Sequence, residues 1–266
     1  MATKDIIEIK RPEIVDVNLR IAGDTPLIMH RWSDKAKRMM LEKQMGKKLN
    51  KKENKNPVED FICSMYWMTD RPTEFTEAAF EEAIQNGAKF GFPVTAIKQA
   101  AISSAYRCGM SKDKVSLQGA FFIKGTGEEL LEEVKYDEAP IMREDMVRVG
   151  MGTADIRFRG QFNRWHMDLT ISYNKAGAYA LEDIINLISL GGYNCGIGEW
   201  RPEKGGQNGM YHVECQYIRQ ARPGLVGRDW VRMVGFGRQG WARLCMAWCG
   251  MVRLGTAGKA GRCVAV

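Results

Sequence analysis

Residues 189–209 read SLGGYNCGIGEWRPEKGGQNG and place seven glycines in the 19 positions from Gly191 to Gly209. Before this run, apolar side chains recur at helical spacing and predict a helix over 178–190. After it, apolar and polar side chains alternate and predict a strand over 210–218. Nucleotide-phosphate loops have the reverse order, with the strand first and the helix second, so this run is not such a loop. It is either a surface hairpin loop, or a loop whose bare backbone grips an extended polymer or a neighbouring subunit.

The rest of the chain supplies a matching set of elements around the glycine run. Alternating apolar side chains predict three more strands, over 14–22, 117–124 and 167–174. A helix over 95–107 begins after Pro93, with Thr95 as its N-cap. The resulting order, β-α-β-β-α-β, is that of an α+β protein with a ferredoxin-like or RRM-like core. Right-handed crossovers place both helices on one face of the sheet and leave the other face free.

Two large insertions interrupt this core, at 23–90 and 125–165. The first is expected to hold a mobile lysine-rich loop at 46–57, where apolar side chains are almost absent, and three helices, near 35–45, 58–67 and 74–86. The second insertion begins with a polar excursion over 125–150. The domain that carries the core and its insertions spans residues 1–218.

The excess of basic over acidic residues is confined to the C-terminal segment of the chain. The 266 residues carry a formal net charge of +7. Residues 219–266 hold eight Arg and one Lys against Asp229, a net +8, which leaves −1 for residues 1–218. Gly, Arg and Trp recur in this segment at a spacing that fits neither helix nor strand. We therefore expect a low-complexity basic tail, which is disordered, docked on a partner, or a translated DNA repeat without a selected role. Any nucleic-acid binding by residues 1–218 must come from local patches.

Composition excludes several classes of protein. No apolar run approaches the ~18–20 residues that span a bilayer, and the first residues lack an apolar signal region. We therefore expect a cytoplasmic protein, in the host-cell cytoplasm if it is viral, with no membrane partner. Seven cysteines at irregular spacing argue against a disulfide framework. With three histidines and no second ligand pair for Cys245 and Cys249, we expect no metal site and no cofactor.

Lys98 is the best single candidate for a phosphate contact. It lies in the first turn of the predicted helix over 95–107, where the helix dipole disfavours a cation by up to about 1 kcal/mol. Either a nearby carboxylate or a bound phosphate would offset that cost.

Two segments together resemble the RAMP superfamily, which includes the backbone subunits of CRISPR effector complexes. Phe92–Ala100, FPVTAIKQA, is similar to the family's pattern at the head of the first helix, an aliphatic residue, Pro, small polar residues, an aliphatic residue and Lys. Leu190–Gly192 with Gly196–Gly198 resembles its glycine-rich loop. The resemblance covers 14–24 and 90–218. It implies a subunit that binds single-stranded nucleic acid through its backbone and stacks head to tail on its own copies. The glycines in close backbone contact would be Gly191, Gly192, Gly196 and Gly198.

The chain departs from that family at several points. Its glycine run carries Glu199–Lys204 where small and basic residues are usual, and residues 30–32 replace a short glycine turn after the first strand. Some family members cut RNA with an acid or a histidine near the first strand, but no position here matches those motifs. No catalytic role is therefore carried over, and the resemblance is to a distant, phage-type relative.

Cations recur beside aromatic side chains outside the regular core, and single-strand-binding proteins use this combination for phosphates and stacked bases. The candidates are His30, Arg31 and Trp32; Arg157 and Arg159, which flank Phe158 on one face of a strand; Arg164 and Trp165; and Trp200 with Arg201 and Lys204. Each base stacked on a ring would contribute about 1–3 kcal/mol. The alternative is that the three tryptophans are core residues, each with an arginine over its ring.

These observations predict a sequence-tolerant protein that binds single-stranded DNA or RNA and oligomerises along the strand. It would act in recombination or replication of a mobile element, or as a backbone subunit of a guide-RNA complex. An enzyme is not expected, because no Ser is paired with a His and an Asp, and because His166 with Asp168 lacks a third group. Two alternatives stay open: a metal-dependent nuclease on the same fold, and a viral assembly subunit that does not bind nucleic acid.

Overall fold

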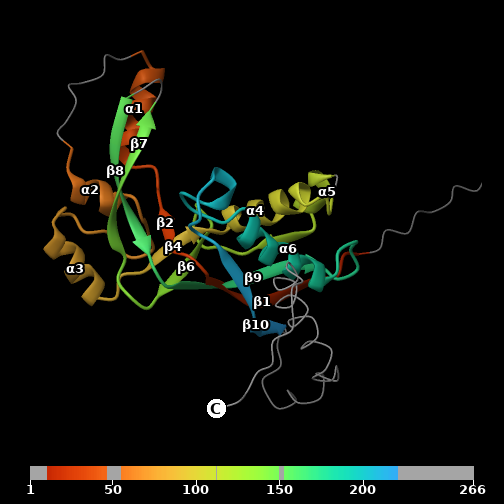
Figure 1. Cartoon of the computed structure of the whole chain (residues 1–266). Helices are drawn as coiled ribbons and strands as arrows, with labels where there is room; N and C mark the ends of the chain where they lie inside the picture. The colour runs from red at the N-terminus through yellow and green to blue at the C-terminus, as the bar shows by residue number, and fades with distance from the viewer. Residues whose placement is uncertain (1–10, 47–54, 112, 150–152, 221–266) are drawn as a thin grey trace, which may run out of the picture. The chain divides into compact units, whose positions relative to one another are not determined.

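The computed structural model describes residues 11–46, 55–111, 113–149 and 153–220 and shows a mixed α+β protein with antiparallel sheets (Figure 1). Most of the lysine-rich loop expected at 46–57 and all but the first two residues of the expected tail lie outside the described residues. Two sheets and the helices that pack on them make up the regular structure of the described part.

The larger sheet is antiparallel, and β1 lies between β10 and β9. Its strands follow one another in space as β10 (Tyr211–Gln220), β1 (Ile14–Gly23), β9 (Trp165–Asn174), β6 (Leu131–Tyr136), β4 (Phe90–Pro93) and β3 (Tyr66–Trp67). The short strand β5 (Phe121–Ile123) pairs with the other end of β9. Burial alternates along β9, and Val17, Leu19 and Ile21 of β1 are buried, as their alternation with polar side chains predicts. One face of this sheet therefore carries the core.

Two helices cover that face, α4 (Val94–Arg107) and α6 (Leu181–Asn194), which lie side by side in Figure 1. They approach closely because Gly191 has no side chain, and a Cβ there would lie 2.7 Å from the backbone nitrogen of Ala101. The hydroxyl of Ser104 in α4 donates a hydrogen bond to the carbonyl oxygen of Leu190 in α6 at 3.1 Å. Both helices thus pack against one another and against the same face of the sheet.

Parts of the segments expected as insertions fold together into a second antiparallel sheet, ordered β2 (Leu27–Met29), β8 (Thr153–Phe162) and β7 (Ile141–Val149), whereas β3 and β6 of the same segments join the larger sheet. Helix α2 (Pro57–Cys63) packs on β8, and the hydroxyl of Ser64 accepts a hydrogen bond from the Gly160 amide at 2.9 Å. Further helical elements are α1 (Asp34–Gln44), α3 (Glu77–Gln85), α5 (Lys114–Gln118) and the 3-10 turn η1 (Pro202–Lys204).

Three predictions from the sequence are wrong in detail. The polar excursion expected over 125–150 contains β6 and β7. The sequence of β7 does not alternate between apolar and polar side chains in the usual way, because one of its buried positions is the charged Asp145. The strand expected over 117–124 shrinks to β5, because Asp113 caps the short helix α5 in front of it. Helix α4 starts directly after Pro93, so Thr95 is not its N-cap.

Candidate functional site

Two neighbouring hollows in the surface bring together residues from both sheets, from α4 and from the glycine run, and His30 lines both. The cation hollow is lined by His30, Arg31, Trp32, Lys55, Arg157 and Phe158, among others. The loop hollow is lined by residues of α4 between Ala96 and Ser103 and by loop residues between Gly196 and Glu203. Because His30 directly follows the completely buried strand β2, the core of the protein fixes its backbone position.

The cation hollow combines three cationic side chains, those of Arg31, Lys55 and Arg157, with two aromatic ones. The Trp32 side chain is 55 % exposed. The Lys55 ammonium lies 6.0 Å from the ring centroid of Phe158. Cations that bind phosphates and rings on which bases stack are the two components of single-strand-binding surfaces.

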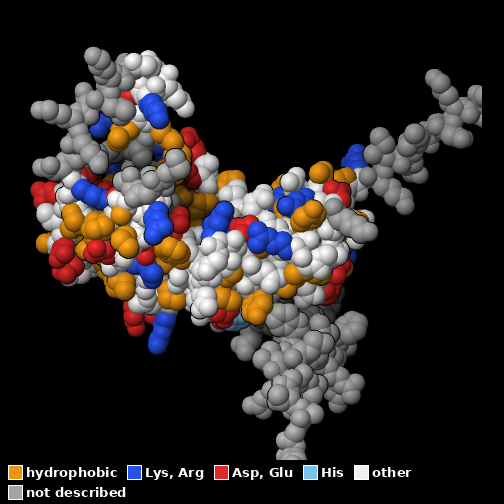
Figure 2. All heavy atoms as spheres, turned by 45° about the horizontal axis from the view of Figure 1, so that its top comes forward, with side chains coloured by type: hydrophobic (Ala, Val, Ile, Leu, Met, Phe, Trp, Pro, Cys, Tyr) orange, Lys and Arg blue, Asp and Glu red, His pale blue; other side chains and the backbone are white. Residues whose placement is uncertain are grey.

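Carboxylates in the same hollow partly neutralise its cations. Lys55 Nζ lies 2.9 Å from Asp155 and 3.9 Å from Asp60, and Arg157 lies 3.6 Å from Asp155. The hydrogen bond from Lys55 lowers the pKa of Asp155, so this carboxylate is ionised at neutral pH. On the face shown in Figure 2, Lys and Arg side chains also lie among acidic and apolar ones. Binding of an anionic polymer would therefore depend on a few placed residues and not on a broad positive field.

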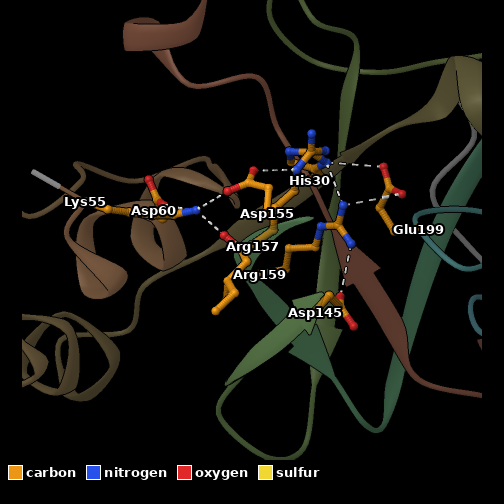
Figure 3. A network of polar contacts seen from close by, with 9 residues as sticks. His30, Lys55, Asp60, Asp145, Asp155, Arg157, Arg159 and Glu199 are labelled. Atoms are coloured by element: carbon orange, nitrogen blue, oxygen red, sulfur yellow. Dashed lines mark hydrogen bonds and ion pairs between the residues drawn. The ribbon is translucent and has the colours of Figure 1, made fainter. Parts of the chain in front are cut away.

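Behind the cation hollow, a buried ion pair supports His30 (Figure 3). The side chains of Arg159 and Asp145 are 3 % and 6 % exposed, and Arg159 Nη1 lies 3.0 Å from Asp145. Arg159 Nη2 lies 3.4 Å from His30 Nδ1 and 3.8 Å from Glu199. Glu199 Oε1 lies 3.3 Å from the same His30 nitrogen. Burial alone would raise the pKa of Asp145, but hydrogen bonds from Arg143 and Arg159 outweigh burial and lower it.

The prediction of a nucleic-acid contact is wrong for Arg159. Strand alternation predicts Arg157 and Arg159 on the same face of β8, but the surroundings of the two side chains differ. Arg157 lines the cation hollow, whereas Arg159 is enclosed by Asp145 and Glu199. Arg159 is therefore a positioning residue that holds His30 and Glu199.

The loop hollow joins the two segments that carry the sequence resemblance, the head of α4 and the glycine run. Gly196 and Gly198 have φ values of 63° and 77°, a region that side chains rarely allow. The Glu199 amide donates to the carbonyl oxygen of Ile28 in β2 at 3.0 Å. The loop is thus fixed against its own chain, and its backbone forms one wall of a hollow.

Gly191 and Gly192 do not belong to that loop, because α6 continues through them to Asn194. Both glycines are buried, and a Cβ on Gly192 would overlap the backbone carbonyl of Tyr211 in β10. Their predicted contact with a polymer backbone is therefore wrong. They serve the close packing of α6 on α4 and on the sheet.

The three candidate tryptophans have different surroundings. Trp165 is 4 % exposed, and its indole N–H donates to the carbonyl oxygen of Thr25 at 2.9 Å. It is a core residue, so the predicted nucleic-acid contact is wrong for it. Its neighbour Arg164 is exposed in the turn between β8 and β9. Trp200 is 40 % exposed but lines neither hollow, which leaves Trp32 as the tryptophan in the candidate site.

Lys98 lies apart from both hollows. Its ammonium donates to the carbonyl oxygen of Gln118 at 2.7 Å and lies 4.1 Å from the ring centroid of Phe122. Partial burial lowers the pKa of Lys98. A carbonyl oxygen and an aromatic ring thus occupy the place for which the sequence suggested a carboxylate or a phosphate.

Arg201 lines the loop hollow but is bound within the loop. Its guanidinium lies 2.9 Å from Glu203 and donates to the carbonyl oxygen of Gly198 at 3.0 Å. Glu203 also binds Arg107 of α4 at 3.0 Å, which ties the loop to that helix. Lys204 is exposed in η1 and lines neither hollow.

The sequence prediction missed Lys55, which was included in the mobile loop expected over 46–57. Asn56 is the N-cap of α2, since its side chain accepts hydrogen bonds from the amides of Val58 and Glu59. Asn followed by Pro is a signal for the start of a helix. That signal would have ended the loop at Lys55.

On the face of the larger sheet opposite the helices, charged side chains of neighbouring strands form ion pairs with one another. Arg20 Nε lies 2.6 Å from Asp168, and Lys135 Nζ lies 2.7 Å from the same carboxylate. The hydrogen bond from Arg20 is the main cause that lowers the pKa of Asp168 to about 2. Asp168 is therefore engaged by two cations from neighbouring strands, and not by His166.

Across residues 11–46, 55–111, 113–149 and 153–220, no three His, Cys, Asp or Glu side chains are grouped so that they could hold a metal ion. In the same ranges no helix has the length and the apolar character to cross a membrane. Comparison of the chain with protein-family models and with curated protein sequences found no match.

Proposed function

We propose that this protein binds single-stranded nucleic acid, DNA or RNA, in the cation hollow and with little dependence on sequence. The observation that carries the proposal is that three cations and the exposed indole of Trp32 line one hollow. Cations bind phosphates whatever the base, and every base has a π face that can stack on an indole. Arg31, Lys55 and Arg157 would contact phosphates, and Trp32 and Phe158 would stack on bases.

We propose further that β1, α4, β5, β9, α6 and β10 form a ferredoxin-like core. Their order along the chain is β-α-β-β-α-β, and in the sheet β1 lies between β9 and β10 while β5 pairs with β9. The resemblance to RAMP backbone subunits supports this assignment. It also supports the role of a binding subunit in place of an enzyme.

Further copies of the same chain are the proposed protein partner. The β7–β8 hairpin exposes Ile141, Met142, Met146 and Ile156, and α1 with the residue after it exposes four further apolar side chains, Met39, Met40, Leu41 and Met45. Exposed apolar surface of this kind is typical of contact sites. Copies arranged head to tail would join successive cation hollows into one track for a strand. Met146→Glu is expected to lower the mass measured by light scattering, and an unchanged mass would count against this contact.

The binding site is tested with fluorescence anisotropy of a labelled single strand of about 12 nucleotides. Trp32→Ala is expected to weaken binding about 5- to 150-fold, because the loss of one base stack costs about 1–3 kcal/mol. Tyr193→Ala is the matched control, since Tyr193 is similarly exposed and lines neither hollow. Equal losses in the two variants would refute the site, and no binding by the unsubstituted full chain at low salt would refute the function.

The phosphate contact is tested through salt dependence. Arg157→Ala should reduce the slope of log K against log salt concentration by about 0.7, and equally for strands of any sequence. Arg148→Ala removes the same charge from an exposed position on β7 outside both hollows and should leave the slope unchanged. Cleavage of the strand that EDTA abolishes would instead support the nuclease alternative.

A further inference from the structure

The loop hollow meets the cation hollow at His30 but offers different chemistry. Its volume of about 320 Å³ is at the lower end for sites that bind small ligands, enough for one flat heterocycle. No lysine lines it, and its one arginine, Arg201, is bound by Glu203 at 2.9 Å. The phosphates of a strand would therefore stay in the cation hollow.

Glu199 supplies an ionised carboxylate to the loop hollow. The hydrogen bond from His30 lowers the pKa of Glu199, so at neutral pH this side chain accepts hydrogen bonds and donates none. The other carboxylate in the lining, that of Glu203, is already held by Arg107 and Arg201. A group that enters the hollow gains from Glu199 only if it carries a hydrogen-bond donor, and a negatively charged group is repelled.

The walls of the loop hollow suit a planar ring. Tyr66 and Phe92 line one part of it, with their ring centroids 6.1 Å apart in an edge-on arrangement. On the loop side, Gly196 and Gly198 line the hollow with backbone, and the side chains they lack would point into the chain itself, 2.8 Å from Pro202 and 2.5 Å from the carbonyl oxygen of Ile28. Ala96 contributes a small side chain from α4.

We propose that the loop hollow binds one unstacked base of the strand whose phosphates occupy the cation hollow, and that it prefers bases with an exocyclic amino group to thymine and uracil. The inference rests on the proposed function. The amino group of cytosine, adenine or guanine donates to a carboxylate such as that of Glu199, as cytosine N4 does when Asp or Glu reads it. Thymine and uracil carry a carbonyl oxygen in the place of the cytosine amino group. Their one ring N–H donor on that edge, N3–H, lies between two carbonyl oxygens, and a carboxylate that approaches it is repelled by both. The protein would thus tolerate most sequences and discriminate at one base for each copy.

Two pyrimidine homopolymers that differ in this group test the inference. The full chain is titrated at neutral pH with labelled oligo-dC and oligo-dT of about 12 residues, which carry the same phosphate charge. We expect oligo-dC to bind about 10-fold more tightly, the order expected for one hydrogen bond to a charged group. Equal affinities would overturn the base preference and leave the proposed function intact. Binding of neither oligomer would overturn the proposed function together with the inference.

Two substitutions connect the preference to the loop hollow. Glu199→Gln should abolish most of it, because an amide donates as well as accepts. Glu133→Gln is the matched control, since Glu133 pairs with Lys89 and lines neither hollow. Ala96→Leu should fill the hollow from α4 and lower the affinity for oligo-dC to that for oligo-dT, which keeps the test decisive if Glu199→Gln does not fold. A 10-fold preference that persists in the folded variants would overturn the assignment.

Discussion

Replacing Asp145 with asparagine tests whether Arg159 is a buried structural cation. Asp145 binds Arg159 at 3.0 Å, and both side chains are almost completely buried. Removal of one partner of a buried pair typically costs about 3–5 kcal/mol, because the other charge stays uncompensated. Glu199 lies 3.8 Å from Arg159 and offsets part of this loss. We therefore expect the free energy of unfolding to fall by about 3 kcal/mol, measured by urea denaturation of the full chain at neutral pH.

The matched control is Asp155→Asn, which removes the same charge from a carboxylate bound by Lys55 at 2.9 Å but well exposed to solvent. Exposed ion pairs contribute about 0.2–1 kcal/mol, so the control should lose no more than that. Losses of equal size in the two variants would refute the reasoning. The double variant Asp145→Leu/Arg159→Met should regain most of the lost stability, because it removes both buried charges.

The same pair gives a pH dependence with a defined sign. The pKa of Asp145 is lower in the folded chain than its ordinary value of about 3.9. Its contribution is therefore complete above that value and is lost as the pH falls through the folded pKa. The stability difference between the unsubstituted chain and Asp145→Asn should shrink in acid. A constant difference over that range would contradict the assignment.

Two further predictions concern the larger sheet and its helices. Asp168→Asn is expected to lower the free energy of unfolding by about 1 kcal/mol at neutral pH, since the carboxylate is partly exposed. The hydrogen bond from Arg20 lowers the pKa of Asp168 to about 2. Urea titrations should therefore show the difference in free energy of unfolding vanish as the pH falls from about 4 toward 2. A difference that does not change with pH would argue against this role of Asp168. Gly192→Ala should destabilise by about 1–3 kcal/mol, because a Cβ would overlap the carbonyl of Tyr211. Gly119→Ala, where the nearest atom would lie 3.9 Å away, should melt close to the unsubstituted chain, and equal melting of both variants would contradict the packing argument.

Strands with one apolar face are predictable from the sequence because alternation reports burial directly. β1 and β9 lie where their alternation predicts them. β7 does not show this pattern, because one of its buried positions is Asp145. The burial of that charge depends on Arg159, a partner on the next strand, and no local window of sequence contains that information.

The sequence predicts the types of residue in the candidate site, but it does not predict which individual residues belong to the site. His30, Arg31, Trp32 and Arg157 line one hollow. Trp165 does not belong to the site, because it lies on the same face of β9 as Met167 and the other buried residues of that strand. The alternation predicted from Met167 onward, extended back by two residues, would have placed Trp165 in the core. Contacts between the two sheets and the glycine run decide which of the other candidates line the hollows. The spacing of residues along the sequence does not predict such long-range contacts.

The charge arrangement of the cation hollow links the proposed binding to the proposed association of copies. A phosphate that reaches Lys55 or Arg157 must compete with Asp155, which already contacts both. The net gain from each phosphate is therefore small, and one copy alone would hold a strand weakly at physiological salt. Copies associated along one strand would bind it at several sites at once. Once one copy is bound, the next copy's site is at a high effective concentration, which raises the total affinity for the strand without any new contact. The nine cations of residues 219–266 would add a second attraction for a strand. The proposed association of copies would make binding cooperative and dependent on the length of the strand, whereas charge attraction to separate copies would not.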